Sequence, residues 1–295
     1  THELIICNTW FYYFEQYLLL YIYYKYNFIR IFILKTIKNM SSDKFGIFFK
    51  MLYNKYVDVI KMRKAVLLIH GLAGGTYDLE NLTNFLQIHN FDTFTFTLPG
   101  HDYKRKVTKE DWINSCEEEL KFIIKSGYKE IYVVGHSMGG ILAAYLASKY
   151  KNVKKVVLAA AAFKHVMSDN NIKNTLKKSP EIIKSYSLSV VIDRLNKLHP
   201  SCLKEFLELV NEKQDVLKNV KCPIMIVQGM DDDLVPPSTA FMIFNKVNSK
   251  IKKLVLCDNC NHHIFKSENR DEIIKTIEKF LRTKVYIKKN EFINL

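Results

Sequence analysis

Cysteine is scarce in this chain. Six cysteines over 295 residues are too few for a disulfide framework, so we expect reduced thiols, as in a cytoplasm. Two of them form a C-x-x-C at Cys257 and Cys260, shortly before a pair of histidines. No second ligand pair with the spacing of a zinc site occurs elsewhere, and the sequence therefore predicts no metal centre. The others are Cys7, Cys116, Cys202 and Cys222.

A long uninterrupted apolar run is also missing. Residues 1–38 are dense in Tyr, Phe, Leu and Ile, but the longest clean run, Tyr17 to Tyr24, falls well short of the roughly 20 residues that a membrane-spanning helix needs. The stretch has no small-residue cleavage site typical of a signal peptide. Three interpretations of residues 1–39 stay open: an aromatic and basic anchor on a membrane surface, an extra helix on the domain, or sequence upstream of a natural start at Met40. The predicted location is the cytoplasm, with membrane contact through residues 1–39 as the alternative.

The chain shows no nucleic-acid-binding motif, although its formal net charge is +14. The lysines are spread along the sequence and no aromatic platform accompanies them. Abundant Lys, Asn, Ile and Tyr, with only 10 Gly and 6 Pro, indicate a bias in composition. We therefore predict no nucleic-acid partner.

From residue 40 onward, short β-branched runs alternate with longer helical patterns, which is typical of successive βα units in an α/β fold. We expect one domain over residues 40–295, with a mainly parallel sheet covered by helices on both faces. A polar, lysine-rich stretch at about 163–220 interrupts this rhythm and is predicted to form a small inserted helical cap. The expected strands are Ala65 to Ile69, Asp92 to Thr97, Ile131 to Val134, Lys155 to Ala160, Ile224 to Val227 and Lys253 to Leu256. The expected helices are Tyr77 to His89, Lys109 to Ser126, Met138 to Lys149, Ser238 to Val247 and Arg270 to Leu281, with helical patches in the cap at Asn171 to Lys178, Pro180 to Leu198 and Cys202 to Lys218.

Chemistry is indicated first at Gly135-His136-Ser137-Met138-Gly139, a G-x-S-x-G motif. It follows a predicted strand and opens a predicted helix, the setting of a nucleophile elbow, in which small neighbours expose the serine hydroxyl. A hydroxyl needs a base to take its proton and an acid to orient that base. The sequence therefore predicts Ser137 as a nucleophile and requires both partners downstream.

Candidates for both partners follow in the order that this arrangement requires. Met230 is followed by three carboxylates at the end of a predicted strand, where open α/β sheets carry functional groups. Asp232 is preferred because it lies three residues after the turn glycine, Gly229; Asp231 and Asp233 remain alternatives. The loop after the next strand supplies His262 and His263, of which only one can face the serine.

The oxyanion of an acyl-transfer reaction needs backbone donors. We expect the Met138 N–H, directly after the nucleophile, and the Leu72 N–H, in the glycine-rich loop after an earlier strand. His70, Gly71 and His136 flank these positions and are predicted to contact substrate.

These motifs resemble the carboxylesterases and monoacylglycerol-lipase-like members of the α/β-hydrolase superfamily. The similarity covers about Lys64 to Leu281 and rests on Val66-Leu67-Leu68-Ile69-His70-Gly71, Leu98-Pro99-Gly100-His101, Gly135-His136-Ser137-Met138-Gly139-Gly140 and Gly229 to Pro236. It implies the triad above and selects His262, because the family's histidine stands about eighteen residues before a closing Phe-Leu, here Phe280-Leu281. Two positions depart from the pattern: Asp102 and Asn261 each replace a common glycine.

The resemblance implies a serine hydrolase that cleaves carboxylic esters through an acyl-enzyme, with no metal or organic cofactor. The expected partner is a small-molecule ester or a monoacylglycerol-like substrate. Two alternatives stay open: a monoacylglycerol lipase or lysophospholipase acting at membranes, and a binding protein that keeps the fold without the chemistry.

Overall fold

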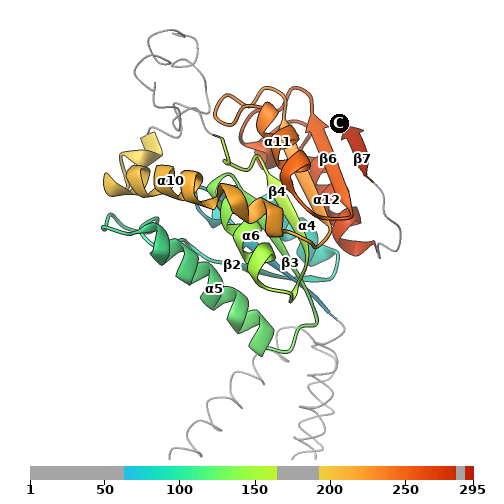
Figure 1. Ribbon diagram of the computed structural model, residues 1–295, viewed down its shortest axis with the longest axis horizontal. Helices are drawn as coiled ribbons and strands as arrows, with labels where there is room; N and C mark the ends of the chain where they lie inside the picture. The colour runs from blue at the N-terminus through green and yellow to red at the C-terminus, as the bar shows by residue number, and fades with distance from the viewer. Residues whose placement is uncertain (1–62, 165–192, 284–289) are drawn as a thin grey trace, which may run out of the picture. The chain divides into compact units, whose positions relative to one another are not determined.

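The computed structural model describes residues 63–164, 193–283 and 290–295. Their centre is a seven-stranded sheet in the order β2-β1-β3-β4-β5-β6-β7, and every neighbouring pair is parallel (Figure 1). This confirms the predicted α/β fold with a parallel sheet. The strands are β1 Lys64–Ile69, β2 Phe91–Thr95, β3 Glu130–His136, β4 Val153–Ala159, β5 Ile224–Gly229, β6 Lys252–Cys257 and β7 Glu291–Asn294.

Helices cover both faces of the sheet, because successive residues of each buried strand point to opposite sides. Leu67 and Ile69 of β1 pack into one apolar cluster with α5, α6, α10 and α11. Val66 and Leu68 pack into the other, with α4 and α12. The helices are α4 Glu80–Ile88, α5 Lys109–Lys125, α6 Met138–Lys149, α10 Ser201–Glu212, α11 Ser238–Lys246 and α12 Arg270–Arg282, with 3-10 turns η1 Thr76–Asp78, η3 Lys213–Asn219 and η4 Ile264–Lys266.

One expected helix outside the cap is divided in two, and one strand was not predicted. The helix expected from Tyr77 to His89 is a 3-10 turn, η1, followed by α4. The last strand, β7, was not predicted. It is a half-exposed edge strand of four residues, so it lacks the continuous apolar run that marks the buried strands.

The predicted cap lies between β4 and β5. Its described part contains α10 and η3 in place of one helical patch from Cys202 to Lys218, and α10 buries Phe206 and Leu209 in the cluster shared with α6. The patch at Asn171 to Lys178, most of the patch at Pro180 to Leu198, and residues 1–39 lie outside the described residues. Within the described ranges, no helix has both the length and the apolar character needed to span a bilayer.

A buried lysine joins the sheet to the carboxyl end of α12. Lys155 of β4 is 7% exposed, and its ammonium donates to the carbonyl oxygens of Phe280, Leu281 and Thr283 at 2.6, 2.8 and 2.6 Å. The last carbonyls of a helix have no partner within it, so this side chain satisfies groups that burial would otherwise leave unpaired. The same ammonium lies 5.4 Å from the ring centroid of Tyr132 on the neighbouring strand.

Replacing Lys155 by methionine is expected to lower the free energy of unfolding by about 2–4 kcal/mol, because it removes three hydrogen bonds and leaves buried carbonyls without donors. Urea denaturation followed by circular dichroism measures this change. The matched control is Lys154→Met at the adjacent, exposed residue, whose ammonium bonds the carbonyl of Lys151 at 3.1 Å. Equal stability of the two variants would show that Lys155 does not hold α12.

Candidate active site

The candidate site lies at the carboxyl ends of the central strands. From β1 the chain passes to β2 on one side and then to β3 on the other, so the loops after β1 and β3 diverge and leave a crevice between them. Open α/β sheets bind ligands at such a switch point. The loop after β1 begins at His70 and the elbow after β3 holds Ser137. The loops after β5 and β6 bring Asp232 and His262 to the same edge.

Ser137 occupies a strained turn. Its φ of 56° and ψ of −120° lie outside the common regions for a residue with a side chain. The turn depends on glycines: a Cβ at Gly135 would lie 2.0 Å from the oxygen of Gly139, and one at Gly139 would lie 2.2 Å from the oxygen of Ile69. This close approach of backbones is the physical reason for the G-x-S-x-G spacing. It places the hydroxyl at the head of α6.

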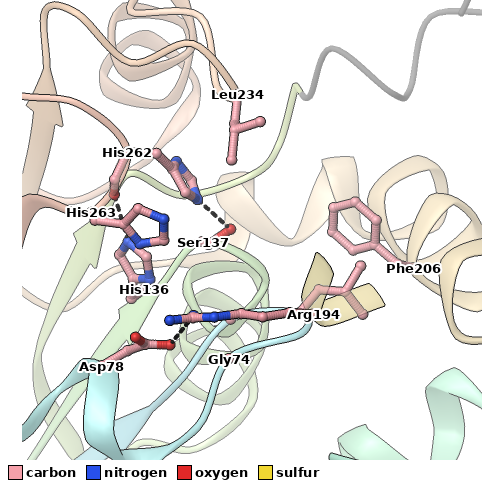
Figure 2. A pocket seen from close by; sticks show the side chains of 11 residues that line it. Gly74, Asp78, His136, Ser137, Arg194, Phe206, Leu234, His262 and His263 are labelled. Carbon is pink, nitrogen blue, oxygen red and sulfur yellow. Dashed lines mark hydrogen bonds and ion pairs between the residues drawn. The ribbon is translucent and has the colours of Figure 1, made fainter. Parts of the chain in front are cut away.

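The structure brings Ser137, His262 and Asp232 together in a hydrogen-bonded chain (Figure 2). The Nε2 atom of His262 lies 3.0 Å from Ser137 Oγ, and its Nδ1 atom lies 3.1 and 3.0 Å from the two carboxylate oxygens of Asp232. All three residues are less than 10% exposed. With the Nδ1 proton donated to Asp232, Nε2 is free to accept the serine proton.

Asp232 is held by donors on every side. Its Oδ1 accepts from the N–H groups of Leu234 and Val235 at 3.0 and 2.8 Å, and its Oδ2 accepts from the Gln228 amide at 2.9 Å. Burial by itself would raise the pKa of this carboxyl, but His262 and the two backbone donors lower it below its usual value. The carboxylate is therefore ionised and fixed in orientation.

The negative charge on Asp232 raises the pKa of the His262 imidazole. Burial disfavours the imidazolium form of His262, yet the Asp232 carboxylate outweighs it, and the pKa of His262 is raised above 6.5. Asp233 adds to this effect through its charge without touching the ring. The environment thus stabilises the protonated histidine that forms when Ser137 gives up its proton.

The glycine-rich loop after β1 lies against the serine. A Cβ at Gly71 would approach Ser137 Cβ to 2.9 Å, so only glycine lets this loop come so close. Leu72 lines the pocket beside the hydroxyl. Met138 is the first residue of α6, and its N–H belongs to the helix donors that lack a partner within the helix. The N–H groups of Leu72 and Met138 remain the predicted oxyanion donors.

His136 and His70, both predicted to contact substrate, differ in position: His136 lines the pocket and His70 does not. His136 lines the pocket, and its Nε2–H donates to the carbonyl oxygen of His262 at 2.9 Å. His70 does not line the pocket. Its Nδ1–H donates to the Gly71 carbonyl at 2.8 Å, and its Nε2 accepts from the Leu98 N–H at 3.0 Å. His70 therefore joins the loops after β1 and β2, and its contact with substrate stays a prediction.

Burial keeps both of these histidines neutral. It lowers the pKa of His136 to about 3, with a further contribution from His262, and it lowers the pKa of His70 to about 4, aided by His101. A neutral ring can act as donor and acceptor at the same time, and His70 does so.

The pocket holds residues that the sequence analysis missed. It encloses about 460 Å³ of empty space, part of it open to solvent. Asp78 follows the glycine-rich loop, whose motif gave a signal for the region but not for the residue. Arg194 and Phe206 belong to no motif, and Leu234 lies within Gly229 to Pro236 but was given no role. The lining also includes Gly71, Leu72, Gly74, His136, Ser137, His262 and His263.

The loop that carries the histidines contains the C-x-x-C motif. Cys257 and Cys260 are buried free thiols, and no group of His, Cys, Asp or Glu in the described part of the chain is arranged to hold a metal ion. Asn261, one of the two departures from the family pattern, accepts a hydrogen bond from the His263 N–H at 2.9 Å through its side chain. That bond helps to shape the turn that presents His262.

Comparisons with known proteins indicate the same fold. A family model described as alpha/beta hydrolase fold matches residues 64–180, and one described as serine aminopeptidase, S33, matches residues 167–269. The carboxylesterase of Bacillus subtilis (strain 168) is 24% identical over 233 residues, which are 74% of this chain and 92% of the relative. The thermostable monoacylglycerol lipase of Bacillus sp. (strain H-257) is 26% identical over 205 residues, covering 67% of this chain and 82% of the relative.

Solved structures share the fold. The monoacylglycerol lipase of Paleococcus ferrophilus superimposes with a TM-score of 0.58 at 18% identity, over 74% of this chain and 93% of that one. A structure from work on the metagenome-derived lipolytic enzymes LipS and LipT gives 0.60 at 19% identity, over 75% and 94%. With its parallel sheet, its elbow serine and these matches, the chain has the α/β-hydrolase fold and is similar to carboxylesterases and monoacylglycerol lipases.

Proposed function

We propose that this protein is a serine hydrolase that cleaves carboxylic esters, with Ser137 as nucleophile, His262 as general base and Asp232 as the acid that orients it. One observation carries the proposal: the hydrogen-bonded chain from Ser137 Oγ through His262 to Asp232, with the serine on a strained turn at the head of a helix. A serine hydroxyl hydrogen-bonded to a neutral imidazole is the arrangement that activates a serine.

The reaction begins when Ser137 Oγ forms a bond to the ester carbonyl carbon and its proton passes to His262 Nε2. The electron pair of the C=O bond moves to oxygen, and the N–H groups of Leu72 and Met138 stabilise that oxyanion. The oxyanion then re-forms the C=O bond, and the bond to the alcohol breaks. His262 gives its proton to the departing alkoxide, and an acyl group stays on Ser137.

Water completes the cycle. His262 Nε2 takes a proton from a water molecule, whose oxygen attacks the acyl carbon, and the resulting oxyanion meets the same two donors. Collapse releases the carboxylic acid and returns the proton to Ser137 Oγ. Throughout, the Asp232 carboxylate stabilises the imidazolium that forms in each half of the cycle.

A fluorophosphonate probe tests the proposal, because it reacts covalently only with an activated serine. We expect the wild-type protein to be labelled at Ser137, as mapped by mass spectrometry, and Ser137→Ala to be unlabelled and inactive on p-nitrophenyl esters. Ser148→Ala, in the same helix, is the matched control; its hydroxyl bonds the Tyr145 carbonyl, remote from the pocket lining. A wild-type protein that takes no label would favour the non-catalytic binding protein.

A monoacylglycerol substrate is the second candidate, because two of the relatives above carry the name monoacylglycerol lipase. The full chain would then release fatty acid from emulsified monoacylglycerols faster than from soluble short-chain esters. The reverse order would favour the carboxylesterase.

A further inference from the structure

The wall of the pocket below Ser137 contains a buried carboxylate, Asp78, that pairs with Arg194 (Figure 2). It pairs with a second cation, Lys266, as well. Asp78 has a side chain only 7% exposed. Its Oδ2 accepts from Arg194 Nη1 at 2.9 Å and from the Gly75 N–H at 3.3 Å, and its Oδ1 accepts from Lys266 Nζ at 2.7 Å. One negative charge thus meets two positive charges, and the cluster keeps one positive charge in excess.

Arg194 is held by its neighbours, but most of its N–H donors form no hydrogen bond with the described residues. A guanidinium has five N–H donors, and within the described residues only the Asp78 carboxylate accepts from this one. The group lies 5.2 Å from the ring centroid of Tyr77, and its side chain is 20% exposed. Because Asp78 and Tyr77 hold it, the guanidinium can bind a second group without losing much side-chain freedom.

The His263 imidazole lies on the same wall, and one of its nitrogens has no hydrogen-bond partner among the described residues. The Nε2 atom of His263 is buried, and no described group forms a hydrogen bond with it. Burial and the neighbouring His262 lower the pKa of His263 to about 4, so the ring is neutral and Nε2 can carry a proton to donate. Buried polar atoms are almost always paired, so an orphan in a pocket indicates a place for a ligand atom.

We propose that Arg194 and His263 form a subsite for an oxyanion group, a carboxylate or a phosphate, carried by the substrate beside the ester that Ser137 attacks. The inference rests on the proposed function. Guanidinium groups bind both anions through paired, charge-assisted hydrogen bonds, and the excess positive charge of the cluster favours an anionic partner. Two other carboxylates act on His262: Asp232 is already met by four donors, and Asp233 contributes through its charge.

The anion has two possible positions in an ester, and matched substrate pairs distinguish them. On the acyl side, p-nitrophenyl hydrogen glutarate is compared with p-nitrophenyl pentanoate, which has the same chain length and no charge. On the alcohol side, monohexanoylglycerol phosphate is compared with monohexanoylglycerol. For one pair we expect a higher kcat/KM for the anionic member, and that pair identifies the source of the anion.

Arg194→Gln is expected to lower the ratio of kcat/KM for anionic over neutral substrate by about 10- to 100-fold, the range for loss of charge-assisted hydrogen bonds. Arg194→Lys keeps the charge but not the planar fork and is expected to give an intermediate ratio. The matched control is Lys197→Gln, a cation three residues away whose side chain is 72% exposed and pairs with Asp193. It is expected to leave the ratio at the wild-type value.

Two further measurements separate this inference from the proposed function. Fluorophosphonate labelling of Ser137 shows whether each variant is folded and reactive. Calorimetry with a hexyl glycerol ether phosphate and the uncharged hexyl glycerol ether measures recognition of the anion without any bond that an esterase can cleave.

Each combination of results has a different meaning. Suppose that Ser137 is labelled and that the ratio of kcat/KM for anionic over neutral substrate is the same in wild type and Arg194→Gln. This result would overturn the subsite and leave the proposed function intact. Arg194 would then have only a structural role, through its ion pair with Asp78. Arginine-dependent binding of the ether phosphate by a protein with an unreactive serine would overturn the proposed function and support the subsite.

Discussion

Replacing His262 by glutamine is expected to lower kcat for ester hydrolysis by about 10⁴- to 10⁶-fold. The amide fills similar space and can still bond Asp232, but it cannot take a proton from Ser137 and return it to the leaving group. Initial rates with a p-nitrophenyl ester measure the loss, and circular dichroism shows whether the variant is folded. The fluorophosphonate label on Ser137 should be lost to a similar extent.

The adjacent histidine supplies the comparison. His263 is half-buried and also lines the pocket. Its ring centroid lies 5.8 Å from that of His262, and of the two histidines only His262 forms a hydrogen bond with Ser137 Oγ. We expect His263→Gln to remain at least about a thousandfold more active than His262→Gln on a neutral ester. Equal losses in both variants would mean that the loop, and not one imidazole, had been disrupted.

The sheet could be predicted from the sequence because its strands are buried on both faces. A continuous apolar run such as Val66 to Ile69 marks the middle of a strand, whereas the ends depend on backbone pairing that composition does not encode. Strand β3 illustrates this: its ladder with β4 continues through Gly135 and His136, residues that a hydrophobic pattern would leave out. The edge strand β7 had no such run and was missed.

The reacting residues could be located because each follows a strand, in the chain order that the elbow requires. It was harder to choose between adjacent candidates, that is, between the two histidines of one loop and among the three aspartates of another. The spacing of a family motif selected His262, and the distance from Gly229 selected Asp232; these are the two side chains that the structure brings to Ser137. No spacing could have predicted the pairing of Asp78 with Arg194, which are 116 residues apart and joined only by the fold.

His70 shows what a motif leaves undecided. Its position in the glycine-rich motif suggested contact with substrate, but both ring nitrogens bond backbone groups within the protein. A sequence motif identifies residues that a site needs without showing which of them face the ligand and which hold the loops in place.

Asp232→Asn is expected to lower kcat by about 10⁴-fold while the protein remains folded. The remaining amide oxygen can still accept from the N–H groups of Leu234 and Val235, so the loop after β5 keeps its main support. The amide nitrogen, however, would point a donor at His262 Nδ1. That favours the tautomer with the proton on Nε2, which can no longer accept the proton of Ser137.

The two backbone donors decide this orientation against Gln228. The Gln228 amide nitrogen, 2.9 Å from Asp232 Oδ2, would face the new amide nitrogen unless it turned away and gave up its contact with the Val235 carbonyl at 3.2 Å, whereas turning the asparagine would set its nitrogen against the N–H groups of both Leu234 and Val235. The matched control is Asp231→Asn, at the adjacent exposed carboxylate, for which we expect activity within about threefold of the wild type.

The pH profile gives an independent test of the same pair. Neutral His262 is the base, so kcat/KM of the wild type should fall as the pH decreases through a pKa above 6.5, the direction set by Asp232. In Asp232→Asn the charge that raises this pKa is gone and burial remains, so the residual activity should persist to lower pH. An unchanged midpoint in the variant would mean that another group controls the profile, and the roles of His262 and Asp232 would have to be reassigned.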